Sequence, residues 1–407
     1  MSVCNPSLLF AGLLAALVAP AALAQVKLSD GMIRIGVLTD LSGLYAEIGG
    51  PGAVEAVRMA AADFMKENPG IKVEVLSADH QNKAEIAAAK ARDWLDAQKV
   101  DMITDLVNSA SALAAVKVAA ERKRVVIVNG AASTRLTNED CSPYSVHYAY
   151  DASALANGTG KYVVRNGGES WYFITSDNAF GQSLEKEVAE VVTANGGKIL
   201  GNSRHALGTS DLTGLLLKAQ SSRAKIIGLA NAGGDTIHTI KAAYDFGLIS
   251  FGKQKLAGLL VFITDVHALG LEATQGMFLT DGFYWNLNEQ TRSWSARYAE
   301  RMNRPPTMVQ AADYSSTMHY LNAVKSAGSD DADAVMRQMR ATPVNDFFAK
   351  NGVVRADGRF VHDMYLMEVK APADSKKPWD YYSIVSIIPG DDAFIPLSRS
   401  GCRLVAK

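Results

Sequence analysis

The chain has few cysteines, few histidines and almost no net charge. Its 407 residues include three cysteines and seven histidines, and the formal net charge is −1. Without a basic surplus it lacks the electrostatic footprint of a nucleic-acid-binding protein, so no nucleic acid is expected as a partner. The histidines show no HExxH or other paired-ligand spacing, so neither a metal nor another cofactor is expected. The sequence also lacks a Gly-x-Ser-x-Gly nucleophile turn, and we expect a protein that is not an enzyme.

Charge is also absent from the first 24 residues. Leu8 to Val18 form an apolar core, and Ala22-Leu23-Ala24 supplies the small residues of a cleavage site. This pattern predicts a signal peptide over residues 1–24 and hence an exported protein. The alternative is a membrane anchor. Gly12 and Pro20 interrupt the apolar run, which is shorter than the ~20 residues of a spanning helix.

Two cysteines remain after removal of such a leader. Cys141 and Cys402 both lie in polar sequence typical of loops. Exported proteins commonly form disulfides, so we expect a bond between these two residues. The alternative is a pair of buried free thiols.

Apolar, β-branched segments alternate with helical patterns over most of the chain. This alternation predicts an α/β fold with parallel sheets and right-handed crossovers. It runs over residues 32–129, breaks, and restarts over 152–262, which indicates two lobes. Within the second set we expect one helix over 152–165 and a strand over 256–262. The C-terminal part differs, with helices followed by paired strand patterns near 358–369 and 381–388.

Several segments carry a resemblance to a known family. They are IRIGVLTDLSGLYAEIG (33–49), NGAASTRLTN (129–138), ITSDNAFGQS (174–183) and the long C-terminal half. In their order and spacing, the chain resembles the type I periplasmic solute-binding proteins of ABC importers. The resemblance is to the branch for branched-chain amino acids, amides and aromatic acids, which includes leucine-binding proteins. It implies two Rossmann-like lobes joined by three crossings, with a ligand in the cleft beyond the carboxyl ends of the strands.

The resemblance also implies a domain organisation and partners. Lobe 1 is expected to comprise residues 25–149 and 284–362, and lobe 2 residues 150–283 and 363–407. A monomer in the periplasm would bind a small molecule and deliver it to the permease and ATPase subunits of an inner-membrane ABC transporter. A ligand sensor for a receptor is the rival function on the same fold.

Two loops of the first lobe contain candidate ligand residues. The family covers its ligand with residues of the first loop, which makes Ser42, Tyr45 and Ile48 candidates. The alternative for Tyr45 is a half-exposed loop aromatic. In the second loop, Asn108 precedes Ser109, which matches the family's carboxylate-binding hydroxyl. A serine at the start of a helix is also an ordinary N-cap, and both roles are compatible.

Three further turns add candidates. Ala131 and Ala132, followed by Ser133, match the positions where the family presents backbone groups; the alternative is a tight turn that needs small residues. In the second lobe, Phe180 matches an aromatic cleft wall, or is a core or surface residue. Asn231 opens a Gly-rich turn whose amides suit ligand oxygens, or is part of a plain helix start.

The hinge and one missing acid bear on ligand class. Tyr284 and Trp285, next to Phe283, suit an apolar ligand wall, and hinge packing is the alternative for at least one of the three. Amino acid binders of the family keep a glutamate where this chain has Leu260. A buried ammonium without a carboxylate is costly, so we expect a carboxylate ligand with an aromatic or keto-acid body. Asp265 could substitute for the glutamate only if the alignment shifts, and an amino acid, amide or urea ligand is the alternative.

Overall fold

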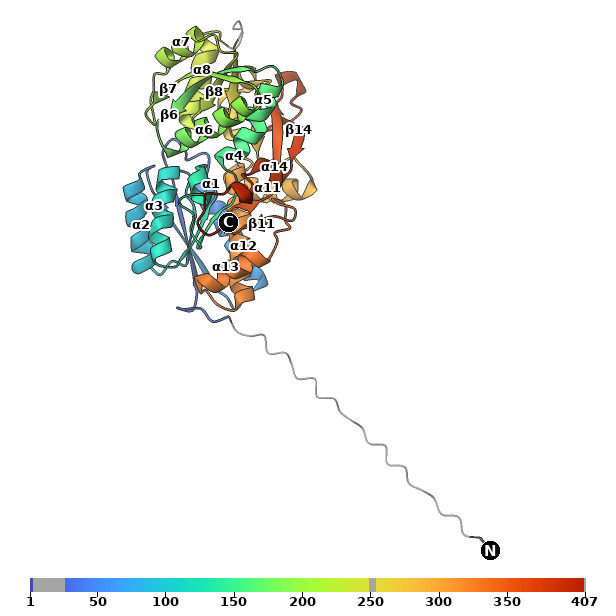
Figure 1. The fold of residues 1–407 in the computed structure, drawn as a ribbon. Coiled ribbons are helices and arrows are strands. Elements are labelled where there is room, and N and C mark those ends of the chain that lie inside the picture. Colours follow the sequence, from blue (N-terminus) through green and yellow to red (C-terminus); the bar gives the residue numbers. More distant parts are fainter. Residues whose placement is uncertain (3–25, 249–253, 406–407) are drawn as a thin grey trace.

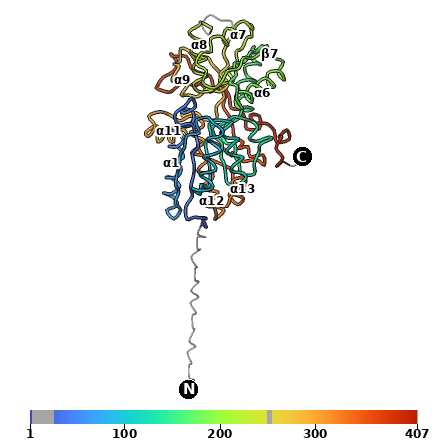
Figure 2. Tube along the Cα trace, turned by 90° about the vertical axis from the view of Figure 1, so that its left-hand side faces the viewer, coloured from blue at the N-terminus to red at the C-terminus, as the bar shows by residue number. Residues whose placement is uncertain are grey.

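The computed structural model describes residues 1–2, 26–248 and 254–405. Two α/β lobes are stacked on each other, and the chain passes between them at several places (Figures 1 and 2). The predicted signal peptide lies almost wholly outside the described residues. No helix among the described residues is long and apolar enough to cross a membrane.

The first lobe is built on a five-stranded parallel sheet with the order β2-β1-β3-β4-β5. Its strands are β1 (Ile33–Thr39), β2 (Val73–Asp79), β3 (Met102–Asp105), β4 (Val125–Val128) and β5 (Ser145–His147). Its helices are α1 (Gly50–Glu67), α2 (Ala84–Asp96), α3 (Ser109–Glu121), α11 (Glu289–Met302), α12 (Met308–Ala327) and α13 (Ala332–Ala341). Residues of α2 and α3 cover one face of the sheet, and residues of α1 and α12 cover the other. Burial on both faces explains why β1 is an almost continuous apolar run.

The second lobe has a four-stranded parallel sheet with the order β7-β6-β8-β9. Its strands are β6 (Ser170–Ser176), β7 (Lys198–His205), β8 (Ile226–Ala230) and β9 (Lys255–Gly258). Its helices are α4 (Ala152–Leu155), α5 (Lys161–Arg165), α6 (Ala179–Ala194), α7 (Thr213–Ser221), α8 (Gly234–Asp245), α9 (Ile263–Leu269) and α10 (Leu271–Thr274). The two sheets confirm the predicted α/β class with two parallel-stranded lobes.

Two elements of the second lobe differ from expectation. The helix expected over 152–165 contains a π-helical segment, Ala156–Gly160, between α4 and α5. There the hydroxyl of Thr280 accepts a hydrogen bond from the Thr159 amide at 2.8 Å, so a side chain inserts into the helical ladder. The strand expected over 256–262 ends at Gly258. A Cβ at Gly258 would lie 2.5 Å from the Val261 side chain, so the chain turns tightly there and then starts α9.

The C-terminal strands form a third, antiparallel sheet of order β10-β13-β14. These strands are β10 (Phe278–Asp281), β13 (Met364–Val369) and β14 (Tyr382–Ile388). A small hairpin pairs β11 (Val353–Val354) with β12 (Phe360–Val361), and α14 (Gly390–Ala393) follows β14. The predicted pairing of the last strand patterns is therefore confirmed for β13 with β14. The exact division into residues 25–149 with 284–362 and 150–283 with 363–407 stays a prediction.

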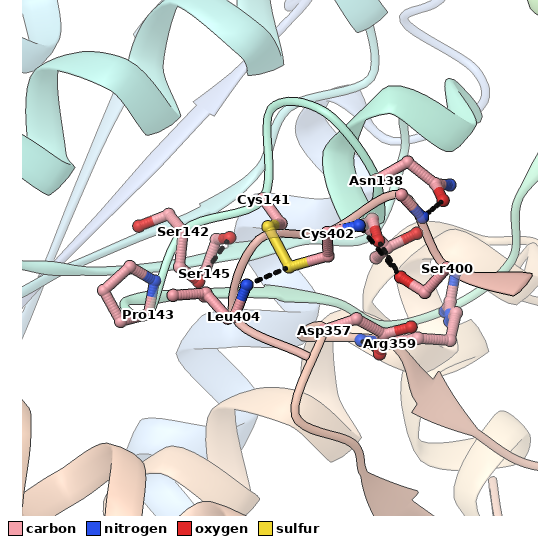
Figure 3. The surroundings of a disulfide bond; sticks show 12 residues. Asn138, Cys141, Ser142, Pro143, Ser145, Asp357, Arg359, Ser400, Cys402 and Leu404 are labelled. Atoms are coloured by element: carbon pink, nitrogen blue, oxygen red, sulfur yellow. Dashed lines mark hydrogen bonds between the residues drawn. A yellow bond between two sulfur atoms is a disulfide. The ribbon is translucent and has the colours of Figure 1, made fainter. Parts of the chain in front are cut away.

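The predicted bond between Cys141 and Cys402 is present. The sulfur atoms are 2.02 Å apart and the two residues are separated by 261 positions. Figure 3 shows the last segment of the chain lying against the loop of Asn138 and Cys141, where the Gly401 amide donates to the Asn138 side chain at 2.8 Å. The bond attaches the C-terminal tail to the first lobe.

Candidate functional site

The first cleft loop is held by a buried aspartate at the carboxyl end of β1. One Asp40 carboxylate oxygen accepts from the Gly43 amide at 2.7 Å, and the other accepts from the Tyr45 amide at 3.0 Å and the Asn82 side chain at 2.6 Å. Asp40 is fully buried. Sequence reasoning missed this residue because Asn82 is distant in the chain, although an Asp followed by Ser-Gly is a common turn signal.

The three candidate residues of this loop differ in their burial and contacts. Tyr45 is only 3% exposed, and its hydroxyl is buried without a hydrogen-bond partner among the described residues. Burial raises the pKa of the Tyr45 hydroxyl well above its usual value. Ser42 is exposed, and its hydroxyl donates to Asp79 at 3.1 Å. Ile48 packs in the core of the first lobe. The Tyr45 side chain is thus buried and not half-exposed, and its hydroxyl has no hydrogen-bond partner among the described residues.

The second loop begins α3 and contains a group of buried hydroxyls. The Asn108 side chain caps the helix by accepting from the Ser111 amide at 3.0 Å, so Asn108 and not Ser109 is the N-cap. Ser109 is 1% exposed, and its oxygen accepts from the Ser133 amide at 3.3 Å. Because that contact uses a lone pair, the Ser109 hydroxyl proton stays available. The hydroxyls of Ser111 and Ser133 are buried without a partner among the described residues.

The turn after β4 presents free amides to the same region. The Ala131 carbonyl pairs with the His147 ring at 2.7 Å, and the Ala132 carbonyl accepts from the Ala152 amide at 2.8 Å. The amides of Ala131 and Ala132 donate to no acceptor among the described residues. Gly130 permits this turn, since a Cβ there would lie 2.5 Å from the Val107 backbone. Together with the Ser109 hydroxyl and the start of α3, these donors suit a carboxylate.

The two candidates in the second lobe, Phe180 and Asn231, differ in what their side chains contact. Phe180 is buried at the start of α6 and belongs to the same apolar cluster as Tyr45 and Ala132. Asn231 is fully buried, but its side chain bonds within its own lobe: it accepts from Thr236 at 2.8 Å and donates to Thr239 at 3.1 Å. The Asn231 side chain therefore stabilises the turn before α8. This fits the alternative that Asn231 is part of a plain helix start.

The hinge aromatics pack mostly against the C-terminal segment. The Tyr284 hydroxyl accepts from the Tyr382 amide at 3.5 Å, and the Trp285 indole donates to the Trp379 carbonyl at 2.8 Å. Phe283 packs edge-on to Trp294 of α11. Tyr284 and Trp285 line a narrow hollow at the hinge that cannot hold a water molecule. Another hollow, of about 510 Å³, lies near Tyr162 and Phe278 and is lined by none of the predicted site residues.

Sequence reasoning missed two buried aromatics, Tyr150, which contacts the turn before Ala131, and Phe262, which packs against Tyr150. The Tyr150 hydroxyl donates to the Gly130 carbonyl at 2.6 Å, and the ring packs edge-on to Phe262 with centroids 6.4 Å apart. Both residues are buried in the cluster that contains Tyr45 and Phe180. The available signal was the position of Tyr150 at the predicted boundary between the two lobes.

The two lobes touch around this cluster. The Gly234 amide donates to the Leu44 carbonyl at 3.2 Å, and Gly233 has a φ of +56° with no room for a side chain against Leu44. On the other side, the hydroxyl of Thr134 donates to Glu187 of α6 at 3.2 Å. Burial, with smaller effects from Asp151 and Glu190, raises the pKa of Glu187 to about 7. The structure therefore has the lobes in contact across the predicted cleft.

The segment where the resemblance places the glutamate of amino acid binders is apolar in this chain. Leu260 is buried, as are its neighbours up to Phe262. Asp265 is also buried, but one of its oxygens caps α9 by accepting from the Phe262 amide at 2.9 Å. Burial raises the pKa of Asp265 to about 7. Among the described residues, no cluster of His, Cys, Asp and Glu could hold a metal ion.

These observations define a class of protein: two parallel α/β lobes that meet over a buried, aromatic and hydrogen-bond-donating site. Comparison with known proteins agrees. The family described as periplasmic binding protein matches residues 32–377, and the chain belongs to that family. It is of the type I, leucine-binding-protein-like kind. No protein with a curated description matches the chain.

Solved structures give the same result. A periplasmic binding protein from Burkholderia mallei is 55% identical, with 92% of this chain and 99% of that chain covered and a TM-score of 0.90. A branched-chain amino acid ABC transporter periplasmic ligand-binding protein from Burkholderia xenovorans is 35% identical and has a TM-score of 0.82. The match covers 92% of this chain and 100% of that chain. A solute-binding protein of an ABC transporter from R. palustris, in complex with benzoate, is 18% identical and has a TM-score of 0.78. The match covers 92% of this chain and 100% of that chain, and it shows the shared fold.

The family implies a small-molecule ligand, an ABC transporter as partner and a periplasmic location. The relatives are solute-binding proteins of transporters and not enzymes. The chain is therefore a substrate-binding component of the ABC transporter type.

Proposed function

We propose that this protein captures a small carboxylate with an aromatic or keto-acid body and delivers it to an inner-membrane permease as a monomer. The observation that carries the proposal is the set of unsatisfied donors in the first lobe. The Ser109 hydroxyl proton and the amides of Ala131 and Ala132 converge where the carboxyl ends of β3 and β4 meet the start of α3. Such donors stabilise an anion at a buried position.

The remaining ligand residues are proposed from their burial and position. Tyr45, Phe180 and Tyr150 would surround the body of the ligand, since aromatic rings favour stacked or edge-on contacts with another ring. Trp285 and Tyr284 would close the hinge side. The proposed set also includes Ser42, Asn108, Ser133 and Asn231.

The surroundings of Leu260 and Asp265 support the proposed ligand class. Leu260 offers no charge, and the Asp265 carboxylate is already used as a helix cap. An unpaired ammonium buried beside them would cost several kcal/mol, enough to remove micromolar binding. Structures of the same fold bound to benzoate and 4-hydroxybenzoate support the idea that it accommodates aromatic acids.

A branched-chain amino acid is the second candidate, because the 35% identical relative is described as a branched-chain amino acid binder. A thermal-shift panel separates the two by comparing leucine, isoleucine, valine and phenylalanine with their keto and hydroxy acids and with benzoate-type acids. A ligand at 100 times its Kd stabilises the folded state by about 2.7 kcal/mol, which shifts the melting temperature measurably. We expect the largest shift from an acid without an α-ammonium, and the largest shift from leucine or phenylalanine would contradict the proposal.

A further inference from the structure

The first crossing between the lobes is held by side chains from the third. Tyr148 to Asp151 lead from β5 into α4, and the backbone carbonyls of the first three of these residues face residues 359–362. His362 contacts the Ala149 carbonyl at 2.8 Å. The carbonyls on either side of Ala149, those of Tyr148 and Tyr150, both accept from Arg359.

Arg359 uses its whole guanidinium group for this purpose. It is 1% exposed. One terminal nitrogen donates to the Tyr150 carbonyl at 3.0 Å and lies 3.4 Å from the Asp151 carboxylate, the other donates to Tyr148, and Nε donates to the Phe360 carbonyl at 3.0 Å. Burial lowers the pKa of Arg359 to about 10, so the group remains charged at neutral pH.

These contacts span the boundary between the lobes. Asp151 also caps α4, the first helix of the second lobe, by accepting from the Ala154 amide at 2.9 Å. On the other side, Tyr150 donates to the Gly130 carbonyl beside the free amides of Ala131 and Ala132. One guanidinium is therefore linked both to the ligand-facing turn of the first lobe and to the start of the second.

The C-terminal tail covers the same group. The Phe394 ring lies under the Arg359 guanidinium at 4.4 Å, and the neighbouring Arg355 donates to the Ile395 carbonyl at 2.9 Å. Figure 3 shows Arg359 and Asp357 close to the segment of Ser400 and Cys402, which the disulfide fastens to the first lobe. Arg359 is thus enclosed by a covalently fixed segment.

We propose that Arg359 is the positioning residue of the hinge, which fixes the rotation of the Tyr148–Asp151 crossing and so selects the arrangement in which the lobes meet. Only a planar fork with several donors can bridge two carbonyls and a carboxylate at once. Lysine keeps the charge but presents a compact ammonium without this geometry. Arg359→Lys should therefore loosen the angle between the lobes while each lobe stays folded.

The test measures the distance between the lobes without any ligand, so its result does not depend on the proposed ligand class. Spin labels are placed on exposed positions of α3 and α7 by the substitutions Lys117→Cys and Lys218→Cys. The native cysteines are bonded to each other and do not take the label. Pulsed electron resonance then gives the distribution of distances between the two lobes.

The matched comparison is Arg359→Lys against Arg355→Lys. Arg355 is an adjacent arginine of the same segment that pairs with Asp357 at 2.8 Å and contacts none of the crossing carbonyls. We expect Arg359→Lys to add populations at distances that the wild-type distribution does not contain. Arg355→Lys should leave the distribution unchanged.

Two outcomes would overturn the proposal. The first is a lower melting temperature of Arg359→Lys with the wild-type distance distribution, because Arg359 would then be a purely structural residue. The second is an equal broadening in both lysine variants. If Arg359→Lys does not fold, Asp151→Asn decides the matter, since asparagine retains the helix cap and removes the charge that Arg359 contacts. A wild-type distribution in Asp151→Asn would then refute the proposed role.

Discussion

Ligand affinity should depend on pH through one carboxyl group at the contact between the lobes. Glu187 lies on α6 of the second lobe and accepts from the hydroxyl of Thr134 in the first lobe at 3.2 Å. Burial raises the pKa of Glu187 to about 7, with Asp151 and Glu190 adding to the effect and Lys186 opposing it. When the lobes separate, this carboxyl regains water and an ordinary pKa of about 4.3. We expect Glu187→Gln to remove the pH dependence.

The sign follows from linkage. Because closure raises the pKa of Glu187, the closed form binds a proton more tightly than the open form, and a fall in pH favours closure. The stabilisation is complete below the open-state pKa of about 4.3 and is lost as the pH rises through about 7. Between pH 8 and pH 5.5, pKa values of about 4.3 and 7 give roughly a thirtyfold gain in affinity. The side chain is partly exposed, so solvent screening reduces this to about tenfold.

Calorimetric titration at several pH values between 5.5 and 8 tests this prediction, with the strongest binder from the acid panel as the probe. Such acids stay ionised over this range, so the ligand adds no titration of its own. Wild-type Kd should weaken about tenfold towards pH 8, whereas Glu187→Gln should keep the affinity of the wild type at pH 5.5. Glu272→Gln, at an exposed position of α10 that does not contribute to the shift of Glu187, is the control and should follow the wild type. A Glu187→Gln profile that matches the wild type would refute the reasoning.

Three further predictions concern the site and the tail. Ser109→Ala should weaken a carboxylate ligand about ten- to hundredfold by calorimetry, because a hydrogen bond to a charged group contributes about 1.5–3 kcal/mol; unchanged affinity would leave Ser109 without a ligand role. Gly233→Ala should abolish ligand-induced compaction in small-angle scattering, since its Cβ would lie 2.4 Å from the Leu44 carbonyl, while Gly214→Ala, with open space around it, should compact normally. The Cys141→Ser/Cys402→Ser double variant should lose several kcal/mol of unfolding free energy in urea. Full alkylation of both thiols in unreduced protein would contradict the bond on which this last prediction depends.

Local sequence patterns were enough to predict the two lobes but not the contacts between them. Alternating apolar strands and amphipathic helices are signals within 10 to 20 residues, and they located most strands of both parallel sheets. Short elements such as β5 and β10 have too few residues to show a period. The π-helical segment after α4 depends on Thr280, more than a hundred positions away, so no local pattern indicates it.

The site divides in the same way. Ser109, Ala131 and Ala132 were predicted from the family resemblance of local segments at strand ends, and their ligand role stays a prediction. Asp40 and Phe262 matter through partners that are distant in the sequence or across the lobes. Asn231 had the expected position, but its hydrogen bonds to residues of α8 could not be foreseen from composition.

The Cys141–Cys402 bond changes what a single cut in the backbone can do. The segments that join the lobes lie between these two cysteines in the sequence, and so do the helices and strands of the second lobe. A protease that cleaves any one peptide bond in this interval leaves one covalent molecule, because the two fragments remain joined through the sulfur atoms. Only reduction together with cleavage separates the pieces. The molecule therefore behaves towards proteolysis as a closed ring from Cys141 to Cys402 that carries the preceding part of the first lobe as a branch, and not as two domains on exposed tethers.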